Sequence, residues 1–210
     1  ANRSRRQDNQ SEQVVAEPHQ QVLHAVHHTA GAADNAGLYA LQHRGQQSCG
    51  IAVSNSGVIE CTKGMGLAAD VFDEEKLGKL KGENVIAHAL YSTAKASNIQ
   101  GAQPFVMRYG KGRLALAHNG SLVNSDELRR ELSMTGAMFR SNSDAEIMAQ
   151  LIAKERLFTH SVEEAVKNAV QKLKGAYSFV VMSPRKIVAA CFFVRIPCLS
   201  FRSSLIVRSV

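Results

Sequence analysis

Four short segments place polar side chains at the ends of predicted strands or at the starts of predicted helices. They are GLYALQHRGQ (37–46), HALYST (88–93), LAHNGSLVN (116–124) and SNSDAEI (141–147). Asn119 ends an apolar run, and Gly120 lets another group approach the backbone closely. Asp144 falls in the first turn of a predicted helix, where the helix dipole favours a carboxylate. Taken singly, an Asn-Gly pair also suits a plain turn, so the chemistry depends on how the segments combine.

The strands that hold these segments follow from alternation and turn residues. Residues 49–54 and 58–63 alternate around Asn55-Ser56-Gly57 and predict a β-hairpin. Strands are also predicted over 84–90 and 113–119, with a loop between them that carries Gly101, Pro104 and Gly110. Two final strands, over 176–182 and 186–194, flank a Ser183-Pro184 turn.

Three helices are predicted from capping signals between the two groups of strands. The signals are Asn124-x-x-Glu127, Ser143-x-x-Glu146 and Ser161-x-x-Glu164. Gly136 and Gly175 suit the left-handed residue that follows a helix. The predicted order along the chain is a group of strands, then three helices, then two more strands. We therefore expect an α+β fold in which helices pack on antiparallel sheet.

Composition excludes several classes of protein. The 210 residues are 45% hydrophobic, which is enough for one domain with a real core. No apolar run is long enough to span a membrane, and the N-terminus lacks the apolar stretch of a secretory signal. The four cysteines form no CxxC, which favours a reducing cytoplasm. The chain starts without Met, as a fragment or processed product would.

The net charge of +7 does not indicate a nucleic-acid partner. The last acidic residue is Glu164, so the excess comes largely from an acid-free C-terminal quarter and not from a basic face with aromatics. His24, His27 and His28 have helical spacing that could serve a metal, but solvated histidines explain them better, and no metal site is predicted. We expect residues 1–36 to be a poorly ordered lead-in, 37–190 to be the functional domain, and 191–210 to be an atypical tail.

Together the four segments resemble the class II glutamine amidotransferase domain of the amidophosphoribosyltransferase family. The resemblance runs from Gly37 to Ala190, and LYALQHRGQ is its most discriminating motif. It implies the N-terminal-nucleophile hydrolase fold, an αββα four-layer sandwich of antiparallel sheets. It also implies hydrolysis of glutamine by an N-terminal Cys, whose thiolate attacks the carboxamide carbon. The ammonia then serves a phosphoribosyltransferase domain, which makes phosphoribosylamine from phosphoribosyl pyrophosphate in purine biosynthesis.

The resemblance also assigns roles to individual residues. Asn119 would supply a side-chain amide and Gly120 a backbone N–H to the oxyanion of the transition state. Asp144 would hold the α-ammonium of glutamine. The loop residues near the substrate would be Tyr91, Ser92 and Thr93, whereas His43 and Arg44 are expected to be structural.

The sequence departs from the family pattern at three places. No Cys precedes Cys49, and Cys49 is internal, so the nucleophile with its free amine is not found. Leu90 stands where the family has the arginine that binds the α-carboxylate. After Ala190 the family's next segment and the whole transferase domain are absent. We therefore expect an impaired glutaminase domain. The alternatives are a non-catalytic glutamine-binding module and a frame-slipped fragment of the same fold.

The expected partners are glutamine, the missing phosphoribosyltransferase domain or subunit, and a possible second copy in a homo-oligomer, with no nucleic acid and no membrane. No cofactor is expected in this chain. The resemblance implies Mg²⁺ for the full-length enzyme and, in some members, a 4Fe–4S cluster.

Overall fold

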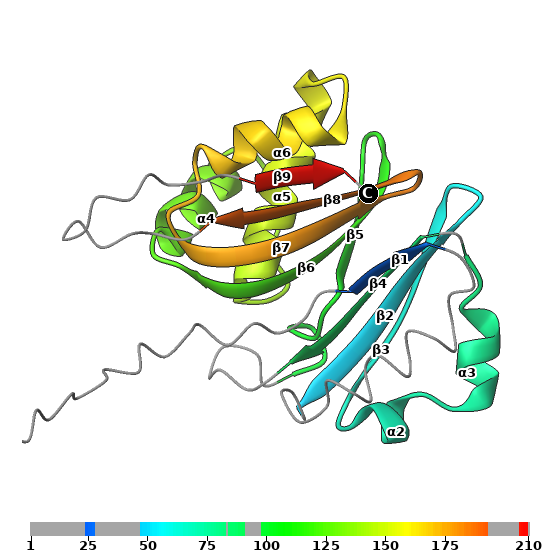
Figure 1. The fold of residues 1–210 in the computed structure, drawn as a ribbon. Helices are drawn as coiled ribbons and strands as arrows, with labels where there is room; N and C mark the ends of the chain where they lie inside the picture. The colour runs from blue at the N-terminus through cyan, green and yellow to red at the C-terminus, as the bar shows by residue number, and fades with distance from the viewer. Residues whose placement is uncertain (1–23, 28–46, 83, 91–97, 193–205, 210) are drawn as a thin grey trace, which may run out of the picture.

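The computed structural model describes residues 24–27, 47–82, 84–90, 98–192 and 206–209. Its strands form two antiparallel sheets (Figure 1). The first sheet has the order β1-β4-β2-β3, with β1 His24–His27, β2 Ser48–Asn55, β3 Val58–Met65 and β4 Asn84–Leu90. The second runs β5 to β9 in sequence order, with β5 Phe105–Tyr109, β6 Gly112–Leu122, β7 Gly175–Ser183, β8 Lys186–Phe192 and β9 Ile206–Ser209.

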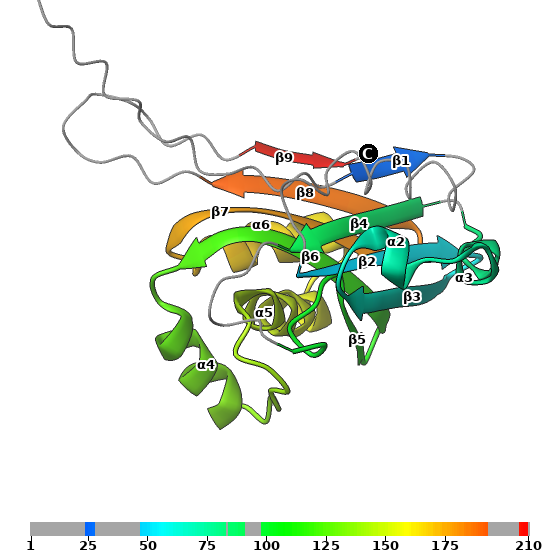
Figure 2. The same cartoon turned by 90° about the horizontal axis from the view of Figure 1, so that it is seen from below.

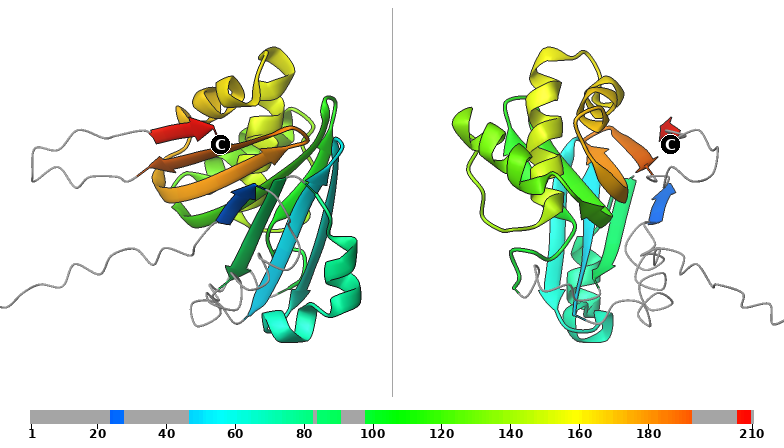
Figure 3. Two further views of the ribbon diagram at one scale, coloured as in Figure 1. Left: turned by 45° about the vertical axis from the view of Figure 1, so that its right-hand side comes forward. Right: turned by 90° about the vertical axis from the view of Figure 1, so that its left-hand side faces the viewer.

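The two sheets face each other, and helices cover both outer faces (Figure 3). The helices are α2 Ala68–Val71, α3 Glu74–Lys79, α4 Ser125–Met134, α5 Asp144–Phe158 and α6 Val162–Val170. Ile86 of the first sheet packs against Ala117 and Val180 of the second, so one apolar cluster lies between the sheets. A second cluster joins α4, α5 and α6 to the outer face of the second sheet. A third lies under α2 and α3. The α+β sandwich of antiparallel sheets is confirmed.

Several predicted elements match closely. The hairpin of β2 and β3 turns at Ser56 and Gly57, whose φ angles of 49° and 87° are both positive. Such angles suit a tight two-residue hairpin turn. Strand β4 has the predicted bounds, and β6 extends three residues beyond its predicted end. Strand β5 was not predicted, because its five residues lie between Pro104 and Gly110 in a stretch that has the composition of a loop.

The capping predictions hold for two helices and are wrong for the third. The Ser143 hydroxyl accepts from the Ala145 N–H, and the Ser161 hydroxyl accepts from the Glu164 N–H. The Asn124 side chain does not cap α4; it donates to the Lys172 carbonyl and accepts from the Lys174 N–H. This contact ties the end of β6 to the approach to β7, which satisfies two backbone groups that helix capping would have left unpaired.

Both terminal stretches contain one described strand. Residues 24–27 form β1, which pairs with β4, and the rest of the 1–36 segment lies outside the described residues. The helical spacing considered for His24 and His27 is not realised, because both lie on a strand. In the tail, β9 pairs with β8. Figure 2 shows these two edge strands on the same side of the molecule. No helix within the described ranges is long and apolar enough to cross a membrane.

Candidate active site

The structure brings together three of the residues predicted to form the site. Asn119 and Gly120 lie near the end of β6, and Asp144 is the first residue of α5. The Leu122 backbone N–H donates to Asp144 Oδ2 at 2.9 Å. Because Leu122 is only three residues beyond Asn119, this bond fixes the carboxylate at the same end of β6 as the Asn-Gly pair. One end of the sandwich therefore carries a carboxamide, a glycine backbone and a carboxylate.

Gly120 occupies a position that requires glycine. Its φ is +116°, and an added Cβ would lie 2.2 Å from the Ala176 carbonyl oxygen and 2.7 Å from Tyr177 Cα on β7. Asn119, its half-buried neighbour, has the strand parity of Ala117, which packs between the two sheets. The Asn119 side chain is thus directed to the intersheet side, while Gly120 allows β7 to approach closely.

Asp144 is buried with half of its carboxylate unused. The residue is 8% exposed, and Oδ1 has no hydrogen-bond partner within the described part of the chain. A buried carboxylate oxygen without a partner is costly, so a cation is the ligand that would satisfy it best. The N-terminus of α5, where Asp144 lies, favours a negatively charged side chain.

Leu90 is the last residue of β4 and is 7% exposed. It has the strand parity of Ile86, which packs between the sheets, and it pairs with Ser48 of β2. The Ser48 hydroxyl is buried without a partner among the described residues. Tyr91, Ser92 and Thr93 follow Leu90 directly and lie outside the described residues, as do His43 and Arg44.

Gln103 is a site residue that the sequence did not reveal. It is 5% exposed, and its side chain bonds both backbone groups of His118, the residue before Asn119. The His118 N–H donates to Oε1 at 2.6 Å, and Nε2 donates to the His118 carbonyl at 3.1 Å. The sequence around Gln103, a glutamine before a proline in a predicted loop, contains no pattern that predicts such a contact.

Two buried histidines lie beside this clamp. His88 of β4 is next to the backbone of His118, without a hydrogen bond of good geometry to it. Burial lowers the pKa of His88 to about 4, against a smaller opposing effect of the His118 backbone. Burial and the nearby His88 lower the pKa of His118 to about 3. Both rings are therefore neutral at pH 7, and neither supplies a cation for a carboxylate ligand.

Cys49 and Cys61 are poorly suited to act as a nucleophile. Cys49 packs in the cluster under α2, on the face of β2 that points away from the second sheet. Burial, with help from the Asp70 carboxylate, raises the pKa of the Cys49 thiol to about 11. Burial also raises the pKa of Cys61 to about 11, although Lys63 opposes the shift. Since the thiolate is the nucleophilic form, both groups are poorly reactive at neutral pH.

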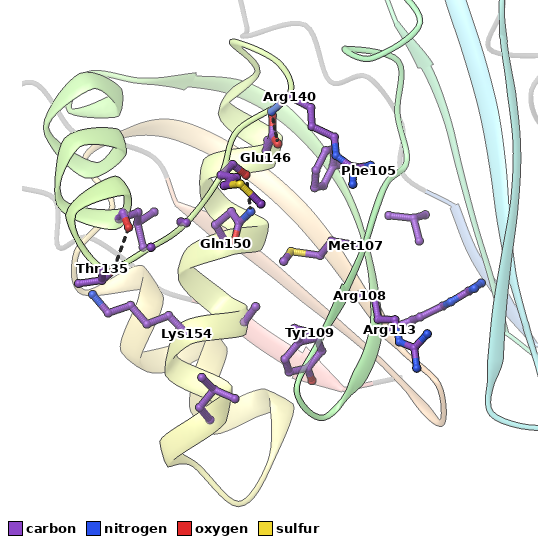
Figure 4. A pocket seen from close by; sticks show the side chains of 17 residues that line it. Phe105, Met107, Arg108, Tyr109, Arg113, Thr135, Arg140, Glu146, Gln150 and Lys154 are labelled. Atoms are coloured by element: carbon purple, nitrogen blue, oxygen red, sulfur yellow. Dashed lines mark hydrogen bonds between the residues drawn. The ribbon is translucent and has the colours of Figure 1, made fainter.

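A cavity of about 600 Å³ lies elsewhere, between β5 and α5 (Figure 4). Phe105, Met107 and Tyr109 line one side, and none of the predicted site residues borders it. The Glu146 carboxylate in its wall already accepts from the Arg140 N–H and from the N–H and hydroxyl of Ser141. The candidate site at the end of β6 is therefore separate from this cavity.

Comparisons with known proteins identify the kind of domain that the chain carries. A family model described as a glutamine amidotransferase domain matches residues 91–194. The chain is 48% identical over 153 residues to the amidophosphoribosyltransferase of Methanocaldococcus jannaschii, covering 73% of this chain and 32% of that protein. It is 39% identical over 155 residues to the Bacillus subtilis protein of the same name, again covering 73% of this chain and 32% of the relative.

Solved structures give the same result for the fold. The glutamine phosphoribosylpyrophosphate amidotransferase of B. subtilis, complexed with ADP and GMP, superposes with a TM-score of 0.72 at 35% identity. The match covers 80% of this chain and 36% of that one. The chain spans about a third of the length of the curated relatives it matches. We conclude that it carries a glutamine amidotransferase domain of the amidophosphoribosyltransferase type, with the N-terminal-nucleophile hydrolase fold.

Proposed function

We propose that this domain binds glutamine at the end of β6 and derives from an enzyme that makes phosphoribosylamine for purine biosynthesis. The observation that carries the proposal is the bond from the Leu122 N–H to Asp144 Oδ2, which places the carboxylate at the same end of β6 as the Asn119-Gly120 pair and leaves Oδ1 without a partner among the described residues. An ammonium group would satisfy Oδ1, and the α-ammonium of an amino acid is such a group. The site thus has one end for the amine and another for the carboxamide.

In this proposal the Asn119 amide and the Gly120 N–H face the carboxamide oxygen of glutamine. Donors fixed at that position stabilise the negative charge that develops on the oxygen when a nucleophile attacks. Neither Cys49 nor Cys61 suits that attack, because Cys49 is buried, Cys61 is half-buried, and both have a pKa of about 11. We therefore propose that the chain binds glutamine without hydrolysing it at a useful rate.

Recognition of the α-carboxylate is expected to be the weak point of the site. Leu90 is apolar and buried, and the neighbouring His88 is neutral at pH 7. Removing one partner of a buried charge pair costs about 2–5 kcal/mol, so glutamine should bind far more weakly than it would beside an arginine.

The chain spans only part of its relatives, so the properties of the whole protein are also proposed. We propose that the transferase function resides in a domain or subunit beyond this chain, that the assembly is cytoplasmic, and that it can form homo-oligomers. Within the described ranges no group of three or more His, Cys, Asp or Glu side chains is placed to hold a metal ion. We propose that the Mg²⁺ and the iron–sulfur cluster implied by the resemblance belong to the transferase part.

The test is a titration with L-glutamine, followed by NMR, of the chain and of its Leu90→Arg and Leu90→Met variants. Leu90→Arg should tighten binding about thirtyfold or more, since about 2 kcal/mol corresponds to that factor. Leu90→Met should leave the affinity unchanged. Ammonia release should stay at background throughout. Binding that is absent in all three proteins would overturn the site, and rapid ammonia release would overturn the argument about the nucleophile.

A further inference from the structure

We propose that Gln103 is a positioning residue that sets the Asn119-Gly120 backbone for the carboxamide end of the ligand. The inference rests on the proposed function, because it assigns the carboxamide to that pair. Gln103 lies outside the four polar segments, and its loss should weaken recognition of the ligand's carboxamide.

The Gln103 side chain takes the place of a missing strand. The ladder between β5 and β6 ends where Phe105 pairs with Leu116. The next residue toward the site on the β5 side is Pro104, which has no N–H to donate and cannot continue the ladder. The Gln103 carboxamide instead accepts from the His118 N–H and donates to the His118 carbonyl. A side chain that serves both backbone groups of one residue holds that peptide as a neighbouring strand would.

The segment that carries Gln103 is itself anchored to the first sheet. Lys63 Nζ on β3 donates to the Ala102 carbonyl at 2.6 Å. A Cβ on Gly50 of β2 would lie only 2.3 Å from the Gln103 carbonyl oxygen, so glycine at that position lets the segment approach. Gln103 therefore links the two sheets at the end of the sandwich where the candidate site lies.

The peptide run from His118 to Leu122 is consequently held at both of its ends. Gln103 fixes its start, and Asp144 fixes its finish through the Leu122 N–H. Between these bonds lie Asn119 and Gly120, whose donors can stabilise charge only if they do not have to reorganise. The two anchors differ in a testable way, because Asp144 would also contact the amine of the ligand and Gln103 would not.

The experiment compares two ligands in the Leu90→Arg protein, where binding is strong enough to measure. L-Glutamine uses both ends of the site, whereas L-norvaline keeps the α-amino acid group and lacks the side-chain carboxamide. Gln103→Met retains the length of the side chain and removes both hydrogen bonds. We expect it to weaken glutamine binding at least tenfold and to change norvaline binding less than twofold. Gln150→Met is the matched control, because Gln150 donates only to the Met138 carbonyl at an exposed position.

Lys63→Met, which releases the Ala102 carbonyl, provides a second arm that keeps the Gln103 clamp intact. It should weaken glutamine binding in the same selective way by a smaller factor, and it decides the matter if Gln103→Met does not fold. Equal weakening of both ligands, or no weakening of glutamine, would overturn the role of Gln103. Failure of the Leu90→Arg protein to bind either amino acid would instead overturn the proposed function itself.

Discussion

Replacing Gly120 by alanine tests whether backbone geometry at the candidate site demands glycine. The new Cβ would lie 2.2 Å from the Ala176 carbonyl oxygen and 2.7 Å from Tyr177 Cα. Both atoms belong to the β7 backbone and cannot rotate away, so β6 and β7 would have to separate. Overpacking of this kind costs about 1–3 kcal/mol. A non-glycine residue at φ +116° adds about 1–3 kcal/mol of backbone strain.

The expected loss in the free energy of unfolding is therefore about 2–6 kcal/mol, a large part of the stability of an ordinary domain. Urea unfolding monitored by circular dichroism would measure it. Gly136→Ala is the matched control, because Gly136 has a φ of +92° and an added Cβ there meets nothing within 4 Å. Its loss should contain the strain alone. If the two variants lose the same free energy, the close approach of β7 is not what requires glycine, and the steric reasoning fails.

Three further predictions concern buried side chains. Burial lowers the pKa of His88 from 6.5 to about 4, so below pH 6.5 the unfolded chain binds a proton there that the folded chain does not. The contribution of His88 to the free energy of unfolding should fall by about 3 kcal/mol between pH 6.5 and pH 4, so His88→Gln should lose about that much less than the parent chain, as denaturation at several pH values would show. Cys49, whose pKa is about 11, should react with iodoacetamide about a hundredfold more slowly than an ordinary thiol at pH 8; mass spectrometry that finds equal rates would refute its burial. Glu146→Ala removes the acceptor of three donors and should destabilise the fold by about 3 kcal/mol, whereas Glu164→Ala, which frees one exposed contact, should cost less than about 1 kcal/mol in the same unfolding assay.

The sequence predicted those parts of the fold that depend on local signals. A strand-like apolar run located β4, and the Asn55-Ser56-Gly57 turn signal located the β2–β3 hairpin. Ser143 and Ser161 cap their helices as their positions indicate. Strand β5 was missed because its pairing with β6 is a tertiary fact that no periodicity in five residues conveys.

Asn124 shows why a local motif can mislead. Its spacing to Glu127 is that of a helix cap. The side chain instead hydrogen-bonds two backbone groups just before β7, the carbonyl of Lys172 and the N–H of Lys174. Those groups lie about fifty residues along the chain, so the competition becomes visible only when the fold is known. Capping statistics describe what a residue can do when no distant partner is available.

The candidate site illustrates the same division between residue identity and geometry. Resemblance selected Asn119, Gly120 and Asp144, because their neighbours form specific motifs. It gave no indication that Asp144 Oδ2 accepts from the Leu122 N–H while Oδ1 has no partner among the described residues. In the proposed function this difference matters, since one oxygen holds the end of β6 and the other would bind the ammonium group of the ligand. A substitution at Asp144 should therefore lower both the stability of the fold and the affinity for glutamine. A substitution at Leu90 should change the affinity alone.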